Sequence, residues 1–227
     1  MIYGIGDLHL DYSKKKPMGI FGEEWIDHEN KIFDNWNKTI TNEDLVLIPG
    51  DISWAIKLKD AYHDLLRIDE LPGHKIITKG NHDYWWRGPR KLNDLNLKNI
   101  KFIQNNSFIY NDKIGIGGTR GWMSRDSEGF DSHDEKVYNR EINRLELSLS
   151  SLGEVQTKII MLHYPPFNID LSPNEFVNVM AKHKVDICIY GHLHAKGHRF
   201  VVEDTINEIK FYCVSSDYID FKPRKIL

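Results

Sequence analysis

KIITKGNHDYWW, residues 75–86, joins a short apolar run to a row of three polar side chains. The run at residues 75–78 predicts a buried β-strand. An amide, an imidazole and a carboxylate come after it in Asn81, His82 and Asp83. Gly-Asn-His-Asp by itself is ordinary turn chemistry. Its significance therefore depends on the residues at the ends of the other predicted strands.

Four other predicted strands also end in carboxylates or imidazoles. These strands are at residues 2–6, 45–48, 158–162 and 185–190. The side chains that come after them are Asp7 and His9, then Asp51, then His163, and finally His192 and His194. If these strands are parallel, their carboxyl ends meet at one edge, where open α/β sheets place their sites. The five strand ends together predict a metal-binding region.

Each strand end has a simpler interpretation when it is taken alone. Asp7-Leu8-His9 is compatible with a surface turn, and Gly50-Asp51 with a tight turn followed by a helix N-cap. His163 could be a packed histidine. The pair His192 and His194 is more informative, because side chains two apart in extended chain face the same side. Independent turns have no reason to supply complementary ligands, so we favour the joint interpretation.

The order of the remaining elements predicts an α/β fold. Helical patterns occur at residues 24–39, 61–68, 135–149 and 173–181. Short strands separated by turns at residues 101–103, 108–110 and 113–116 indicate an antiparallel portion. Two closing strands are expected at residues 199–202 and 208–214. No repeat or linker divides the chain, so we expect one domain over residues 1–227.

Composition excludes several classes of function. The net charge of -3 argues against a nucleic-acid partner, because electrostatic binding of nucleic acid needs a basic face. Cys188 and Cys213 lie in apolar runs, which favours reduced, buried thiols over a disulfide. The N-terminus has no signal-peptide pattern, and no run reaches the roughly 18 apolar residues of a membrane helix. We therefore expect a soluble, cytoplasmic protein without membrane contact.

The candidate ligands define the chemistry of the predicted site. Oxygen and nitrogen donors without thiolate suit Mn, Fe, Zn or Co better than Ca. They are too many for one ion with an open position, but they suit two ions that share a carboxylate, with Asp51 as the natural bridge. Paired ions of this kind support in-line attack on phosphorus. The candidate ligands are Asp7, His9, Asp51, Asn81, His163, His192 and His194.

The five motifs, in this order, resemble the signature of the calcineurin-like metallophosphoesterases. The resemblance runs from Asp7 to His194 and implies a four-layer α/β/β/α sandwich of two mixed β-sheets flanked by helices. It also implies two divalent or trivalent ions and a metal-activated hydroxide. One ion is implied to be held by Asp7, His9, Asp51 and His194, and the other by Asp51, Asn81, His163 and His192.

The resemblance assigns the rest of the opening motif to catalysis. His82 is implied to be a catalytic group that binds no metal, paired with Asp83. We expect protonated His82 to stabilise the transition state or protonate the leaving alkoxide. We expect Asp83 to orient the imidazole and raise its basicity.

Two differences from related proteins narrow the range of expected substrates. Protein serine/threonine phosphatases of the superfamily carry an Arg soon after the second motif and a Glu after Gly-Asn-His. This chain has Ile52-Ser53-Trp54 and Asp83 at these places, so it resembles the bacterial-type branch. A small phosphorylated or nucleotide-like substrate is therefore expected.

Substrate contacts should come from the variable segments. Trp85, Arg87, Arg120 and Trp122 are candidates, and residues 119–136 could form a lid loop. The tryptophans could instead pack between layers, and Arg120 could pair only with Asp126 or Glu128.

Three functions remain compatible with the motifs. The first is a phosphatase or phosphodiesterase, the second a nuclease, and the third a non-catalytic scaffold on the same fold. A scaffold has no physical need for His82, which favours an enzyme. No pattern in the sequence indicates an oligomeric state.

Overall fold

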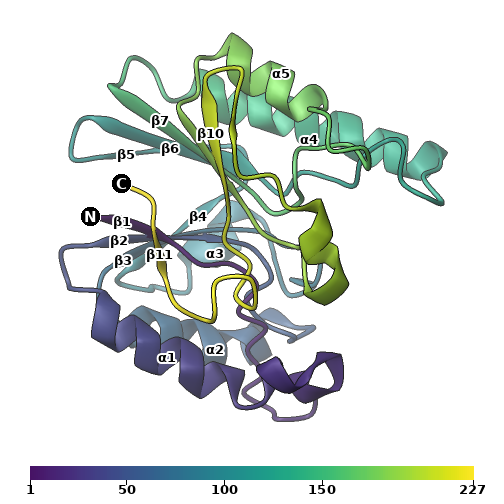
Figure 1. The fold of residues 1–227 in the computed structure, drawn as a ribbon. Coiled ribbons are helices and arrows are strands. Elements are labelled where there is room, and N and C mark those ends of the chain that lie inside the picture. The colour runs from purple at the N-terminus through teal and green to yellow at the C-terminus, as the bar shows by residue number, and fades with distance from the viewer.

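The strands of the chain form two separate sheets in a computed structural model that describes residues 1–227 (Figure 1). The first sheet has the order β11-β1-β2-β3-β4 and the second β5-β6-β7-β8-β10-β9. The strands of the first sheet are β1 (Ile2–Gly4), β2 (Leu45–Pro49), β3 (His74–Thr78), β4 (Ile100–Ile103) and β11 (Arg224–Lys225). The strands of the second are β5 (Phe108–Tyr110), β6 (Ile114–Thr119), β7 (Thr157–Leu162), β8 (Ile187–Tyr190), β9 (Thr205–Ile206) and β10 (Ile209–Cys213).

Both sheets are parallel at their centres and antiparallel at their edges. Strands β1 to β4 pair in parallel, as do β6, β7, β8 and β10. The edge strands β11, β5 and β9 pair antiparallel. The expected parallel centre is therefore confirmed. The antiparallel portion expected at residues 101–103, 108–110 and 113–116 is wrong for the first of these strands, because β4 pairs in parallel with β3 in the other sheet, and correct for β5 and β6.

Helices cover the outer face of each sheet, which gives four layers. Figure 1 shows α1 and α2 against the first sheet, and α4 and α5 against the second. This arrangement confirms the predicted α/β/β/α sandwich of two mixed sheets. The helices are α1 (His28–Thr39), α2 (Leu58–Glu70), α3 (Pro89–Asn93), α4 (Ser132–Ser150) and α5 (Glu175–Lys182), with 3-10 turns at Met18–Phe21, Glu23–Trp25 and Ala195–Phe200.

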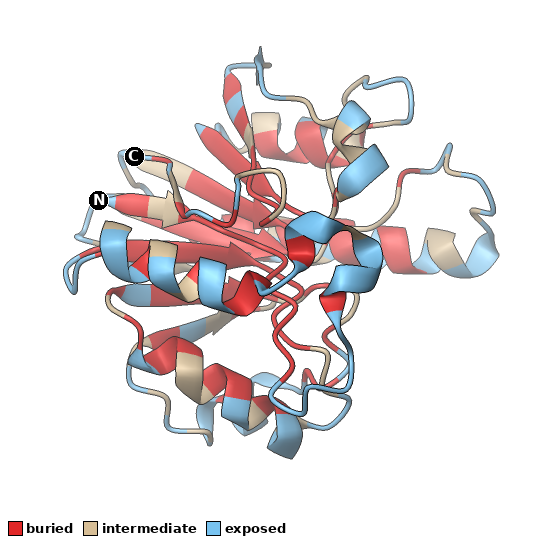
Figure 2. Cartoon of the chain, turned by 60° about the horizontal axis from the view of Figure 1, so that its bottom comes forward, coloured by how far each residue is buried: buried red, intermediate tan, exposed pale blue.

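Alternation along the strands explains why both faces of each sheet are buried. Leu45 and Leu47 of β2 point into the core between the sheets, whereas Val46 and Ile48 contact the core under the helices. Side chains alternate across a strand, so a fully apolar strand fills two layers at once. Figure 2 shows this as buried strands beneath helices that are buried on one face only.

The long helix α4 begins at a capping box. Asp131 accepts hydrogen bonds from the backbone N–H groups of His133 and Asp134, at 2.7 and 3.0 Å. The Asp134 carboxylate accepts in return from the Asp131 N–H at 3.1 Å. These reciprocal bonds satisfy N–H groups that the first turn leaves free, so the helix begins before the expected residue 135.

Two further expected elements differ from the structure. The helix expected from residue 24 begins at His28, because Asp27 has left-handed backbone with φ 58° after a 3-10 turn. The strand expected at residues 199–202 is wrong. The Tyr190 hydroxyl donates to the Val202 carbonyl and accepts from its N–H, at 2.9 and 2.8 Å, so this backbone pairs with a side chain instead of a strand.

Cys188 and Cys213 are free and buried, which confirms the expectation of unpaired thiols. None of the helices has both the length and the apolar character needed to cross a membrane.

Candidate metal centre

The carboxyl ends of β1, β2, β3, β7 and β8 bring the candidate ligands to one edge of the molecule. The connecting loops are bonded to each other through their backbones. Asp7 N–H donates to Gly50 O and His9 N–H to Asp51 O, both at 3.0 Å, and Gly191 N–H donates to His163 O at 3.1 Å. The His192 N–H also donates to the Asp7 carboxylate at 2.9 Å, which joins the loops of the two sheets around the candidate ligands.

Left-handed backbone aims several of these side chains inward. Asp7, His9, Asp51 and His192 have φ values of 57°, 45°, 53° and 72°. This region is uncommon for residues other than glycine, and such residues cluster at functional sites. Four of the seven candidate ligands have this left-handed conformation, which indicates a functional site at this edge of the molecule.

Glycines allow the loops to approach closely. Gly50 has φ 92°, and a Cβ there would lie 2.6 Å from Gly80 N. A Cβ on Gly191 would lie 2.5 Å from an Asp7 carboxylate oxygen. The glycines that precede Asp51, Asn81 and His192 therefore serve loop contact as well as turn geometry.

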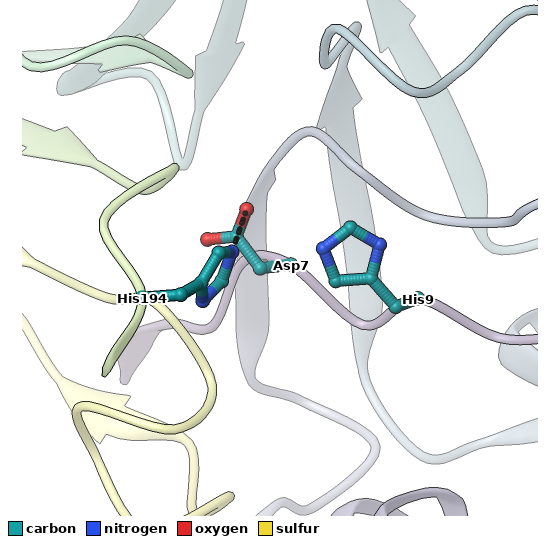
Figure 3. Close-up of side chains that lie close together, drawn as sticks. All are labelled: Asp7, His9 and His194. Atoms are coloured by element: carbon teal, nitrogen blue, oxygen red, sulfur yellow. Dashed lines mark ion pairs between the residues drawn. The ribbon is translucent and has the colours of Figure 1, made fainter. Parts of the chain in front are cut away.

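One group of candidate ligands is formed by Asp7, His9 and His194 (Figure 3). His194 Nε2 lies 3.4 Å from Asp7 Oδ1. The His9 ring lies near these groups, with its Nε2 3.7 Å from Asp51 Oδ2. The four residues implied to hold the first ion are thus neighbours.

A second group surrounds His163. Its Nε2 lies 2.6 Å from Asn81 Oδ1, 3.3 Å from His192 Nδ1 and 3.5 Å from Asp51 Oδ2. Asp51 thus lies between the two groups, because the same oxygen faces His9 and His163. Asp7 is also central, since its Oδ1 lies 3.8 Å from His163 Nδ1.

Hydrogen bonds behind the imidazoles fix their orientation. His163 Nδ1 lies 3.0 Å from the Pro49 carbonyl oxygen, and His194 Nδ1 lies 2.7 Å from Asp217 Oδ1. With Nδ1 held in this way, Nε2 of each ring faces the carboxylates, and the neutral form of the ring presents a lone pair there. This arrangement is usual for histidine ligands of metals.

Burial explains the charge state of the centre. Burial lowers the pKa of His163 to about 4 and that of His192 to about 3. Both imidazoles are therefore neutral near pH 7 and keep a lone pair for a cation. Burial, with the charges of Asp83 and Asp7, raises the pKa of Asp51 well above its usual value.

His194 and Asp7 behave differently because they face each other. Burial opposes the charged form of His194, but Asp7 and Asp217 outweigh it and raise the pKa of His194 to about 10. Burial also opposes ionisation of Asp7, yet the neighbouring imidazoles, His194 above all, hold its pKa below the usual range. Asp7 and Asp217 therefore stabilise positive charge at the position of His194.

The residues fit bound cations. Asp7 Oδ1 and His194 Nε2 are buried without a hydrogen-bond partner. The close pair of His163 Nε2 and Asn81 Oδ1 would bring two lone pairs together when the imidazole proton is on Nδ1. A cation beside these atoms would satisfy both observations.

The His82 ring lies 5.7 Å from the ring of the candidate ligand His9, but the expected pairing of His82 with Asp83 is wrong. Asp83 is fully buried and accepts from the backbone N–H groups of Gly80, Asp51, Ile52 and Ser53 and from the Trp85 indole, at 2.8 to 3.3 Å. His82 Nδ1 has no partner. The pKa of His82 is lowered, mainly by burial, and not raised. Neighbours in a tight turn point in different directions, so the carboxylate holds backbone instead.

Trp54 is the group that contacts the His82 ring. The centroids of the Trp54 and His82 rings are 4.5 Å apart. Trp54 also stacks on His9, with the ring centroids 4.8 Å apart. Trp54 thus packs against two imidazoles of the site.

Asp217 is a residue of the site that the sequence patterns did not reveal. It lies four residues after the end of β10 and contacts both His194 and His198, with His198 Nε2 3.1 Å from Asp217 Oδ2. A polar residue after an apolar strand is the same signal that revealed the other residues. His198 thus shares a carboxylate with a candidate ligand.

The candidate substrate residues have different positions. Trp85 is fully buried in the core under α1 and α2, so its predicted substrate contact is wrong. Arg87 is exposed. Arg120 pairs with Glu141 at 3.5 Å, and neither Asp126 nor Glu128 is its partner. Trp122 is half-buried and donates to Asp134 at 3.1 Å.

The expected lid includes more regular structure than predicted. Thr119 ends β6 and α4 starts at Ser132, so the irregular part is residues 120–131. Asp126 accepts from the Ile169 N–H at 2.9 Å. This part borders an apolar cavity of about 250 Å³ that reaches His192. A lid role stays a prediction.

The two-sheet fold and this cluster of ligands define a metal-dependent phosphoesterase. The chain belongs to the calcineurin-like phosphoesterase family, whose model matches residues 1–196. This match confirms the resemblance and the assignment to phosphoric ester hydrolases.

Individual relatives are distant. Gene 66 protein of Mycobacterium phage L5 is 30% identical over 87 residues, which are 38% of this chain and 40% of that protein. The match thus spans less than half the length of this curated relative.

Solved structures show the same fold. The phosphopantetheinyl hydrolase PptH from Mycobacterium tuberculosis has a TM-score of 0.64 and 14% identity, with 100% of this chain and 95% of that chain covered. Protein AQ665 from Aquifex aeolicus, described as of unknown function, has a TM-score of 0.51 and 20% identity, with 99% and 94% covered.

Proposed function

We propose that this protein is a dinuclear-metal phosphoesterase that cleaves a monoester or diester bond of a small phosphorylated or nucleotide-like substrate. The observation that carries the proposal is the position of Asp51 Oδ2, 3.7 Å from His9 and 3.5 Å from His163. One carboxylate oxygen thus faces an imidazole from each ligand group. A carboxylate in this position would suit two ions that share it.

Each group supplies the ligands for one ion. Asp7, His9 and His194 with Asp51 would hold the first ion, and Asn81, His163 and His192 with Asp51 the second. Mn, Fe, Zn or Co suits these nitrogen and oxygen donors. When bound, the ions supply an activated water and neutralise charge that develops at phosphorus.

His82 is proposed as the proton donor to the leaving oxygen. Its ring is held by Trp54 at 4.5 Å, and its backbone N–H donates to Asp51 at 2.8 Å. Burial lowers its pKa, so the free enzyme carries a neutral imidazole at pH 7. A bound phosphate brings negative charge, which favours the protonated form that can donate.

A small substrate agrees better with the charge of the chain than a nucleic acid does. The net charge is -3, and binding along a phosphate backbone needs a basic face. The free thiols Cys188 and Cys213 suit a reducing compartment, so we place the enzyme in the cytoplasm.

Hydrolysis of p-nitrophenyl phosphate and bis-p-nitrophenyl phosphate tests the proposal. The protein is stripped of metal and reloaded separately with Mn, Fe, Co and Zn. Turnover should return with at least one metal and be lost in His82→Ala but kept in His133→Ala, an exposed histidine of α4. Reloaded protein that binds two ions yet cleaves neither ester would contradict the proposal for these substrates and favour a binding role.

A further inference from the structure

A cavity of about 320 Å³ lies beside the candidate metal centre, between the ends of β3, β4 and β6 and helix α4. Four cationic side chains line it and one carboxylate, that of Glu141, faces them. The cations are Lys79, Arg87, Arg120 and Arg144. We call these five residues with Gln104 the cationic pocket. Both sheets contribute to it, as they do to the metal centre.

The carboxylate does not balance the cations. Glu141 is fully buried and pairs with Arg144 at 2.7 Å and more loosely with Arg120 at 3.5 Å. Lys79 has no ion pair and no side-chain hydrogen bond, although it is partly buried in the cavity. Arg87 donates only to the carbonyls of Tyr84 and Trp86. Within the pocket, three positive charges remain in excess.

Two further polar atoms lack partners. Arg120 Nε and Gln104 Oε1 are buried and make no hydrogen bond. The Arg120 N–H needs an acceptor, whereas Gln104 Oε1 needs a donor, so only Arg120 points to an anion. Buried polar groups are usually satisfied, so each such atom calls for a partner. Guanidinium groups are suited to phosphate because their N–H donors match its oxygens. An anion would therefore satisfy Arg120 and reduce the repulsion among the cations.

The pocket is connected to the metal centre through the segments that carry both sets of residues. Lys79 is two residues before Asn81, and the Arg120 carbonyl accepts from the N–H groups of His163 and Tyr164, both at 3.0 Å. A series of side-chain contacts also leads from the pocket to a candidate ligand. Arg120 lies 4.2 Å from the Trp122 ring, Trp122 lies 5.3 Å from Tyr164, and Tyr164 lies 4.2 Å from His192.

We propose that the cationic pocket binds a second phosphate group of the substrate while the ester to be cleaved lies at the metal centre. The inference rests on the proposed function and names its substrate class, a molecule with two phosphate groups. Lys79 and Arg87 would supply the unpaired charge, and Arg120 the directional donors. The substrate is therefore recognised at two separated anionic ends.

Inhibition by paired phosphonates tests this inference. Alkane bisphosphonates with one to five carbons between the phosphorus atoms are compared with alkylphosphonates of the same length, as inhibitors of ester hydrolysis by metal-loaded enzyme. At one distance between the phosphorus atoms, the bisphosphonate should bind about 10–100-fold more tightly than the alkylphosphonate of the same length. Lys79→Met should remove most of this advantage, Lys79→Arg should keep it, and Lys136→Met, an exposed lysine of α4, should leave it unchanged.

The outcomes separate the two proposals. If no spacing gives an advantage, or if Lys79→Met keeps the full advantage, the second phosphate site is wrong; in the latter case chelation by the ions explains the binding. If no ester is hydrolysed, the proposed function fails, and calorimetric titration with the same phosphonates still tests the pocket. Thermal melting of Lys79→Met should match the parent, since Lys79 holds no other group.

Discussion

Asp83 and Asp217 are two buried carboxylates behind the candidate metal centre, and they contact different groups. Asp83 lies after β3 and accepts only from N–H donors of nearby loops, four of them backbone groups. Asp217 lies after β10 and contacts imidazoles, those of His194 and His198. The sequence suggested a carboxylate–histidine pair at Asp83, but the structure has that pair at Asp217. Adjacency along the chain therefore says little about which side chains meet.

We infer that Asp83 maintains the shape of the loops and that Asp217 orients a candidate ligand. Asp83 ties the loop of Asp51 to the loop of Asn81, so it sets the positions of two ligands at once. Asp217 sets the direction of one ring. Substitutions should therefore affect stability in the first case and metal affinity in the second.

His82→Ala should produce the largest effect. Loss of a positioned proton donor should lower kcat by about 10²–10⁴-fold. Metal content and thermal stability should remain, because His82 Nδ1 makes no hydrogen bond to another residue. Steady-state kinetics with metal analysis checks this, and unchanged turnover at full metal occupancy would remove His82 from the mechanism.

Asp83→Ala should destabilise the fold by about 3–5 kcal/mol, because five buried donors lose their acceptor. Urea unfolding of metal-free protein measures this directly. Asp34→Ala, an exposed carboxylate of α1, is the matched control and should change stability by less than about 0.5 kcal/mol. Normal stability with reduced kcat would instead indicate that Asp83 acts on His82.

Asp217→Ala should weaken the binding of one ion by about 10–100-fold while the fold remains, since groups behind a metal ligand have effects of this size. Calorimetric titration of stripped protein with Mn should show one weakened and one normal site. Equal weakening of both sites, or of neither, would be inconsistent with a role through His194.

Trp54→Leu should have the smallest effect, a fall in kcat of about 3–10-fold, because an aromatic contact contributes about 0.5–1.5 kcal/mol. Trp54→Phe should restore most of the activity. The pH profile of kcat adds a readout specific to positioning. If Trp54 keeps His82 buried, the His82 ring should become more exposed in Trp54→Leu. Exposure removes the cause that lowers the pKa of His82, so the part of the pH profile that depends on His82 should move toward higher pH.

Much of the fold and the centre is readable from the sequence because it depends on local pattern. Apolar strands such as β2 that end in Gly50-Asp51 are visible in the sequence, and parallel pairing places their ends together. The features that the sequence does not reveal depend on tertiary contacts. Glu141 is the partner of Arg120 from across a loop, and the indole of Trp85 faces Asp83 and the core. No local pattern distinguishes a buried tryptophan after a motif from one that contacts substrate.

The central claim is that Asp51 lies between two ions that act together. Titration of stripped protein with Mn, monitored in parallel by calorimetry and by hydrolysis of bis-p-nitrophenyl phosphate, tests it most directly. We predict that full turnover needs two equivalents per chain and that Asp51→Asn loses both tight sites. Full turnover at one equivalent, or two tight sites retained in Asp51→Asn, would contradict the account.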